Sequence, residues 1–210
     1  MGKAVHSFRD EKKYRLLYEL PYTEVMPFVM KQIRRKGTAS FLFLGLNLLS
    51  LGTIVLVLIL GLSQQWFPWQ KLLIHIPLGL LSGGLLIIPF HELLHGLAYR
   101  LLGARKIIFG ADMKQFIFFV TAHEHAVSGI QLAFLALFPF LVINSLCIAA
   151  AISLFPGAIL FFAFLLLIHN LMCIGDFAMV NFACRRGKRI YSYDDPEKKL
   201  SYFFQELSPD

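Results

Sequence analysis

Four long apolar runs, separated by short polar segments, dominate the pattern along this chain. The runs cover residues 39–62, 72–102, 129–155 and 157–184. A helix needs about 20 residues to cross the hydrocarbon core of a bilayer, so each run is long enough to span it. The second run is long for one span and contains Pro77 and Pro89, so we expect it to be tilted or kinked. The pattern predicts an α-helical integral membrane protein with about four transmembrane helices.

The polar ends of the chain predict two segments on either side of a four-span core at residues 39–184. In residues 1–38, Thr23 is placed to cap a short helix that would lie on the membrane surface, and a solvated linker fits the pattern equally well. Residues 185–210 form a polar tail, in which Pro196 is placed to start a short helix.

A different pattern separates the second and third runs. Residues 105–121 hold two stretches rich in aromatic and β-branched side chains around Gly110, which is typical of a β-hairpin. Ser128 and Gln131 follow with the spacing of a capping box, which indicates the start of the third helix. We therefore expect a small β-hairpin between spans two and three.

Composition and charge sharpen the membrane prediction. The chain is 57% hydrophobic and only 16% charged, which is too apolar for an ordinary soluble domain. Nine of its 20 Lys and Arg residues precede the first run, and others follow the second and fourth runs. The positive-inside rule then places both termini and the middle loop in the cytoplasm. The net charge of +7 fits this topology and contact with the lipid bilayer, and requires no nucleic acid.

The strongest candidate for chemistry is His91-Glu92-Leu93-Leu94-His95, inside the second run. Histidines four residues apart lie on the same face of a helix, one turn apart. Two such histidines with an adjacent glutamate match the two ligands and the general base of zinc metalloproteases. Ionisable groups within a membrane span are functional candidates by default, because burying them in hydrocarbon is costly.

Asp176 is the candidate third ligand. Of the 13 Asp and Glu residues, only Glu92 and Asp176 fall within the four runs. His91 precedes Arg100 by nine residues and Asp176 precedes Arg185 by nine, so both would lie about 13 Å inside the cytoplasmic boundary of straight spans. A catalytic zinc ion takes three protein ligands and leaves a fourth position for water, which fits two histidines and one aspartate.

These residues also carry a family resemblance. His91-Glu92-Leu93-Leu94-His95-Gly96, followed by Gly175-Asp176, resembles site-2-protease-type intramembrane zinc metalloproteases, and more closely the small bacterial membrane proteins described as zincin peptidases. The resemblance extends over residues 89–176. It implies one zinc ion held by His91, His95 and Asp176, with Glu92 as the base. We accordingly expect an integral protein of the bacterial cytoplasmic membrane.

His169 and Asn170 are further candidates in the fourth run. His169 lies seven residues before Asp176 on the same helix face, which would place it about 10 Å deeper, too deep for a ligand. It would line the cavity, where it contacts a ligand residue or the substrate, or form an interhelical hydrogen bond, or, despite this depth, act as a ligand itself. Asn170 fits an interhelical hydrogen bond or the same cavity. His123 and His125 favour a solvated loop over a competing metal site.

The function predicted from these residues is zinc-dependent hydrolysis of a peptide bond within or next to the membrane, on the cytoplasmic side. The alternative is a non-enzymatic membrane protein with a structural or sensory metal site. An exposed hairpin edge would hold a membrane-embedded or membrane-proximal peptide by strand addition, or the hairpin would only cover the helices. The candidate substrate strand comprises Phe116, Ile117, Phe118 and Phe119. The sequence identifies neither the substrate nor the oligomeric state.

Overall fold

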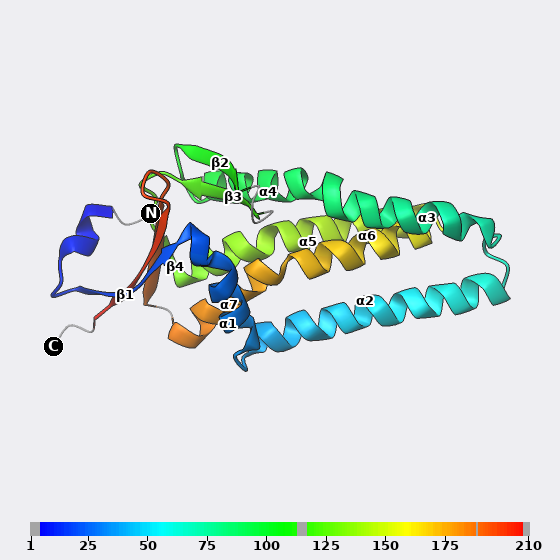
Figure 1. Cartoon of the computed structure of the whole chain (residues 1–210), viewed down its shortest axis with the longest axis horizontal. Helices are drawn as coiled ribbons and strands as arrows, with labels where there is room; N and C mark the ends of the chain where they lie inside the picture. Colours follow the sequence, from blue (N-terminus) through cyan, green and yellow to red (C-terminus); the bar gives the residue numbers. More distant parts are fainter. Residues whose placement is uncertain (1–4, 113–116, 188, 208–210) are drawn as a thin grey trace. The chain divides into compact units, whose positions relative to one another are not determined.

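The computed structural model of the chain describes residues 5–112, 117–187 and 189–207, and it is mostly helical (Figure 1). The helices are η1 (Val5–Arg9), η2 (Tyr22–Glu24), α1 (Val25–Arg34), α2 (Thr38–Ser63), α3 (Gln70–Leu81), η3 (Ser82–Leu86), α4 (Ile87–Leu101), α5 (Gly129–Ser153), α6 (Ile159–Met172) and α7 (Ile174–Arg186). The strands are β1 (Tyr14–Pro21), β2 (Ile107–Asp112), β3 (Ile117–Ala122), β4 (Val127–Ser128), β5 (Ile190–Asp195) and β6 (Leu200–Glu206).

Among the described residues, three helical stretches are long and apolar enough to cross a membrane, or four if the pair α6 and α7 counts as one span. The most apolar windows of the stretches at Thr38–Ser63 and Gln70–Leu101 are each only 11% buried. Apolar side chains that are exposed to this extent over a whole helix need a lipid environment, because water would penalise that surface. The prediction of a membrane protein is supported, with three to four spans.

The chain forms two compact units. The first comprises Met1–Ser40, Glu92–Phe138 and Gly175–Asp210, and the second comprises Phe41–His91 and Pro139–Ile174.

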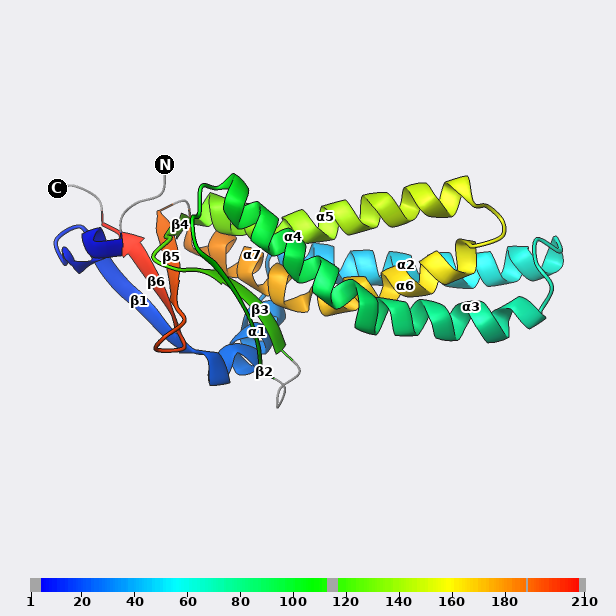
Figure 2. The ribbon, with the colours of Figure 1, turned by 90° about the horizontal axis from the view of Figure 1, so that it is seen from above.

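In the second unit, α3 and the adjoining η3 lie beside α6 because a glycine in each removes the side chains between them (Figure 2). A Cβ atom on Gly79 would stand 2.6 Å from the carbonyl oxygen of Phe161, and one on Gly83 would stand 2.8 Å from that of Leu165. This spacing of small residues is the usual means of bringing helix backbones together in a membrane. The close contact positions α6, which carries His169.

The long second run is one helical stretch of 32 residues, Gln70–Leu101, with a local irregularity. Ser82–Leu86 forms a π-helical turn between α3 and α4. Such turns insert an extra residue into the helix and often occur at functional sites. The irregular turn lies between Pro77 and Pro89, and α4 starts at Ile87, four residues before His91.

The fourth run does not form the straight helix that the sequence predicted. Cys173 has φ −68° and ψ 10°, which ends α6, and α7 begins at Ile174. The two helices are bent by 46°, so the fourth run is not the straight span from which the depth of His169 was derived.

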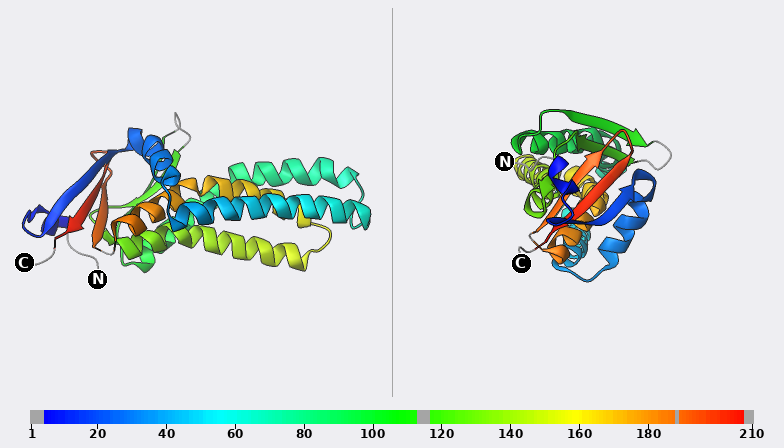
Figure 3. Two further views of the ribbon diagram at one scale, coloured as in Figure 1. Left: turned by 90° about the horizontal axis from the view of Figure 1, so that it is seen from below. Right: turned by 90° about the vertical axis from the view of Figure 1, so that its left-hand side faces the viewer.

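In the first unit, a four-stranded antiparallel sheet has the order β1-β6-β5-β4 (Figure 3). The helix expected after Pro196 is wrong, because Leu200–Glu206 is the strand β6. Its backbone is paired on both sides, with β1 and with β5, which satisfies more polar groups than an isolated short helix could. Phe203 of β6 is fully buried and packs with residues of α1 and α7.

The segment before the first span contains the predicted helix and an unpredicted strand. Helix α1 starts at Val25, with no side-chain cap from Thr23, and β1 precedes it. The C-terminal end of α1 is held by Asn181 of α7, whose Nδ2 donates to the carbonyl oxygens of Gln32 (2.9 Å) and Arg35 (3.0 Å). This segment is thus part of a folded unit.

The predicted hairpin is confirmed and packs against α4 (Figure 2). Strands β2 and β3 pair antiparallel, with Ile107 opposite Ala122. The ring of Phe109 fills the space beside Gly96, where a Cβ atom would stand 2.8 Å from its Cζ. The capping box is also confirmed, since the Ser128 N–H donates to Gln131 Oε1 at 2.8 Å. Gly96 therefore makes room for the hairpin on the motif-bearing helix.

Candidate metal centre

Helix α4 presents the three motif residues on adjacent turns. Donor atoms of His91, Glu92 and His95 lie within 4.8 Å of one another, and all three side chains are half-buried. The spacing follows from the helix itself, since residues at i and i+4 lie one turn apart on one face. The motif therefore offers two imidazoles and a carboxylate at one position along the helix.

His95 is oriented through both of its ring nitrogens. Nδ1 lies 3.0 Å from the carbonyl oxygen of Leu135 and Nε2 lies 3.3 Å from Oδ1 of Asp176. A carbonyl oxygen only accepts, so Nδ1 must carry a proton and donate it. In a neutral imidazole the lone pair is then on Nε2, pointing at Asp176. The predicted ligands His95 and Asp176 are thus brought together, within the first unit.

The carbonyl oxygen of Leu135 is available because of a proline. In a regular helix this oxygen would accept the N–H of residue 139, but Pro139 of α5 has no N–H. The carbonyl can therefore accept from His95 instead. Sequence reasoning missed this contact, although the proline inside an apolar run was a usable signal for a freed carbonyl four residues earlier.

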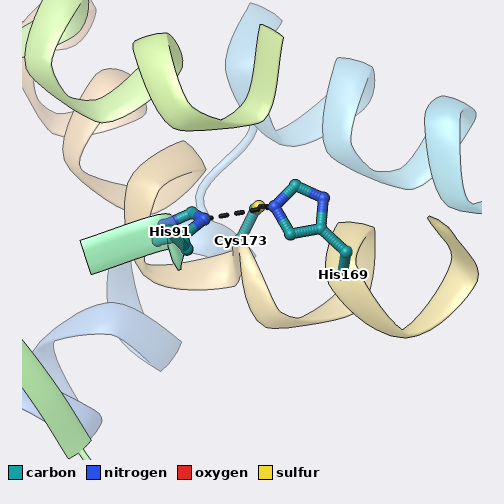
Figure 4. Close-up of side chains that lie close together, drawn as sticks. All are labelled: His91, His169 and Cys173. Carbon is teal, nitrogen blue, oxygen red and sulfur yellow. Dashed lines mark hydrogen bonds between the residues drawn. The ribbon is translucent and has the colours of Figure 1, made fainter. Parts of the chain in front are cut away.

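His91 is oriented by His169 in the second unit (Figure 4). Nδ1 of His91 lies 3.1 Å from Nε2 of His169, and the two ring centroids are 5.3 Å apart. This hydrogen bond is one of the roles predicted for His169, a contact with a candidate ligand residue. If Nδ1 of His91 carries the proton of this hydrogen bond, its Nε2 presents the lone pair, as in His95.

The residues fit a zinc ion. Two acceptors, the Nε2 lone pair of His95 and the Asp176 carboxylate, face each other at 3.3 Å, so a cation or an extra proton must lie between them. Zinc bonds of about 2.0–2.1 Å to nitrogen and oxygen place two ligand atoms of a tetrahedral site about 3.3 Å apart. The described residues form two groups of three close donors, and Asp176 is in neither of them. Its measured contact is with His95.

Cys173 was missed as a site residue. Its Sγ lies 3.7 Å from Nε2 of His169, and His91, His169 and Cys173 form the second group of close donors. Cys173 lies within the fourth apolar run, where a cysteine usually acts as a small buried hydrophobic residue. The usable signal was the separation of four residues between His169 and Cys173, which places them on one helix face.

Asn170 forms interhelical hydrogen bonds, one of the two roles predicted for it. Its Oδ1 accepts from Asn144 of α5 at 2.9 Å, and its Nδ2 donates to Ser50 Oγ of α2 at 3.0 Å. The side chain is buried, so these bonds satisfy groups that hydrocarbon would leave unpaired. Asn170 thereby ties α6 to α2 and α5 at the residue that follows His169.

The remaining candidates lie around the hairpin. Phe116 and the side chain of Ile117 lie outside the described residues. Phe118 is exposed, whereas Phe119 packs over Gly110 and against the ring of Tyr22. His123 and Glu124 form a turn after β3. Burial lowers the pKa of His125, and the two close-donor groups of the described residues include neither His123 nor His125.

Comparison with known protein families identifies the family of this chain. A family model described as "Putative zincin peptidase" matches residues 84–191, just over half of the chain. The matched stretch contains the α4 motif, the hairpin, His169 and Asp176. No curated protein and no solved structure matches the chain. The chain belongs to the putative zincin peptidase family.

Proposed function

We propose that this protein is an intramembrane zinc metallopeptidase of the site-2-protease type. Family membership suggests metallopeptidase activity and zinc, and the long apolar helices suggest a membrane protein. The observation that carries the proposal is the contact of His95 Nε2 with the Asp176 carboxylate, two acceptors that require a cation or an extra proton between them. We assign one zinc ion to His91, His95 and Asp176.

Residues around the proposed zinc ion have different roles in the proposed reaction. Leu135 and His169 hold the Nδ1 sides of His95 and His91, so that both Nε2 lone pairs stay available as ligands. Zinc, when bound, would lower the pKa of a water molecule and polarise the scissile carbonyl. Glu92, next to His91 on α4, accepts the proton of the attacking water and passes it to the leaving amine. A structural metal site would need no such base.

The substrate proposed is an extended peptide segment within or next to the membrane. Zinc peptidases cleave an extended backbone, and a two-stranded hairpin leaves strand edges that a third strand can join. The hairpin packs on the motif-bearing helix through Phe109 and Gly96, and Phe118 is exposed on β3. Strand addition along Phe116–Phe119 would deliver a peptide next to α4.

The charge distribution supports a cytoplasmic active site. Lys and Arg residues cluster before α2, after α4 and after α7, which supports a cytoplasmic location for those ends by the positive-inside rule. His91 and His95 lie near the α4 end that is followed by Arg100 and Arg105. Both termini and the proposed site would then be on the cytoplasmic side of a bacterial cytoplasmic membrane.

The test is cleavage and zinc content measured on the same purified preparations in detergent. With fluorescein-labelled casein and a set of transmembrane peptides as substrates, Glu92→Gln should lose at least about 100-fold in cleavage rate while it retains zinc. His95→Ala should lose the zinc. Glu124→Gln, which changes an exposed acid in the turn after β3, is the matched control and should leave both unchanged. Equal cleavage by Glu92→Gln and wild type would overturn the proposal in favour of a non-enzymatic metal protein.

A further inference from the structure

We infer that His91, His169 and Cys173 form a second, thiolate-containing metal site, which takes zinc or another thiophilic ion in competition with the hydrolytic site. All three residues belong to the second unit, and their donor atoms lie within 4.8 Å of one another (Figure 4). Two imidazole nitrogens and one sulfur are the donors of several tetrahedral zinc sites. The site shares His91 with the hydrolytic site but contains neither His95 nor Asp176.

The distances match a tetrahedral ion without large movement. Bonds of about 2.0 Å to nitrogen and 2.3 Å to sulfur give edges of about 3.3 Å between nitrogens and 3.6 Å between nitrogen and sulfur. Nε2 of His169 lies 3.1 Å from Nδ1 of His91 and 3.7 Å from Sγ of Cys173. The donor atoms of His91 and Cys173 therefore already lie at nearly the distances from Nε2 of His169 that binding to one shared ion requires.

The surroundings favour a soft ion over a hard one. His169 is 1% exposed and Cys173 is fully buried, so water ligands for a hard cation such as magnesium have little access. Thiolate and imidazole donors select zinc or copper among the biological metals. Binding would release the thiol proton of Cys173, and the thiolate would cancel one charge of a divalent ion within an apolar environment.

His91 cannot serve both sites while its ring is neutral, because a neutral imidazole has one lone pair. In the hydrolytic site Nε2 of His91 is the ligand and Nδ1 carries the proton that faces His169. In the second site Nδ1 is the ligand, so the proton moves to Nε2 and that lone pair is lost. Occupancy of the second site would therefore inhibit hydrolysis, and this regulatory consequence rests on the proposed function.

The test uses cobalt as a spectroscopic substitute for zinc in the full-length protein. A cobalt ion bound by thiolate gives a sulfur-to-metal charge-transfer band in the near ultraviolet, whereas one bound only by histidine and carboxylate does not. We expect the band in wild type with excess cobalt and its loss in Cys173→Ser, Cys173→Ala and His169→Ala. Cys147→Ser, which changes another buried cysteine of the second unit, is the matched control and should retain the band. Size-exclusion profiles and circular dichroism identify any variant that fails to fold.

The two proposals fail in different ways. His95→Ala should abolish zinc-dependent cleavage yet keep the cobalt–thiolate band, because His95 belongs only to the hydrolytic site. A band missing from wild type and from His95→Ala, or unchanged in folded Cys173→Ser, would overturn the second site. If the band depends on Cys173 while Glu92→Gln cleaves as wild type does, the second site stands and its inhibitory role falls.

Discussion

Nε2 of His95 and Oδ1 of Asp176 lie 3.3 Å apart, although the hydrogen bond from Nδ1 to Leu135 leaves both of these atoms as acceptors in the neutral ring. A bound zinc ion resolves this conflict, and the negative charge of Asp176 contributes to holding it. Neutralising Asp176 should therefore weaken zinc binding without removing the histidines.

Asp176→Asn is expected to lower zinc affinity by at least about tenfold. Competition with a chelator of known affinity measures this change. Asp195→Asn, a half-exposed aspartate at the end of β5, is the control and should bind zinc as wild type does. Unchanged affinity in Asp176→Asn would remove the aspartate from the ligand set.

Much of the candidate site was predictable because it depends on local spacing. His91, Glu92 and His95 share one helix, and a separation of four residues fixes their common face before any tertiary structure is known. The contact of His169 with His91 was not predictable in this way. It depends on the end of α6 at Cys173, where the sequence shows only an apolar run without a break.

In the fold, too, features that depend on neighbouring residues were predictable, and pairing between distant segments was not. The hairpin and the capping box at Ser128 were predicted from neighbouring residues, and both are present. Strand β6 was mistaken for a helix because Leu200, Phe203, Phe204 and Leu207 also have helical spacing. Its partner β1 lies almost 200 residues earlier in the chain, and such pairing between distant segments overrides local pattern.

The close packing of α3 and η3 against α6 should be disrupted when Gly79 or Gly83 gains a side chain. The backbone oxygen of Leu165 would stand 2.8 Å from a Cβ atom on Gly83, and backbone cannot swing aside as a side-chain end can. We expect Gly83→Val to destabilise the protein by about 1–3 kcal/mol, measured by denaturation in detergent. Gly45→Val on α2, where a Cβ would meet nothing within 4 Å, is the control. Equal stability of the two variants would argue against this packing.

Gly96→Ala should weaken the packing of the β2–β3 hairpin against α4. The added Cβ would stand 2.8 Å from Cζ of Phe109, so the ring must shift from its position beside α4. Hydrogen exchange should then become faster in residues 107–112 and 117–122, and the cost should be about 1 kcal/mol. The double variant Gly96→Ala with Phe109→Leu shortens the ring and should recover part of the protection. Slow exchange in Gly96→Ala alone would contradict the proposed packing.

Asp194 should make the stability of the first unit depend on pH. Burial raises the pKa of this carboxyl, while hydrogen bonds from Ser201 and Tyr99 partly lower it. The folded protein therefore binds a proton more readily at Asp194 than the unfolded chain, and the stability linked to that proton is lost as pH rises from 3.8 through the raised pKa.

Asp194→Asn keeps a neutral side chain whose oxygen can still accept from Ser201. We expect its unfolding free energy to fall less than that of wild type over this range, with a higher stability at neutral pH. A pH series of thermal denaturation measures both. A wild-type stability that rises more steeply with pH than that of Asp194→Asn would show the sign to be wrong.

Replacing Pro139 by alanine should raise the stability of the protein and lower its zinc affinity. The substitution restores an N–H at residue 139, which can form the helical hydrogen bond with the carbonyl oxygen of Leu135 and so compete with His95 Nδ1. Helix α5 should gain up to about 3 kcal/mol, because proline is unfavourable within a helix.

Zinc affinity should fall by about 10- to 100-fold in the same variant, since the partner that fixes the ring of His95 is shared or lost. Denaturation in detergent and chelator competition on one preparation measure the two effects together. Pro77→Ala is the matched control, because Pro77 also lies inside an apolar helix but precedes the π-helical segment by five residues and His91 by 14 residues. It should raise stability and leave zinc affinity unchanged. A Pro139→Ala variant that gains stability and binds zinc as tightly as wild type would show that the Leu135 carbonyl does not orient His95.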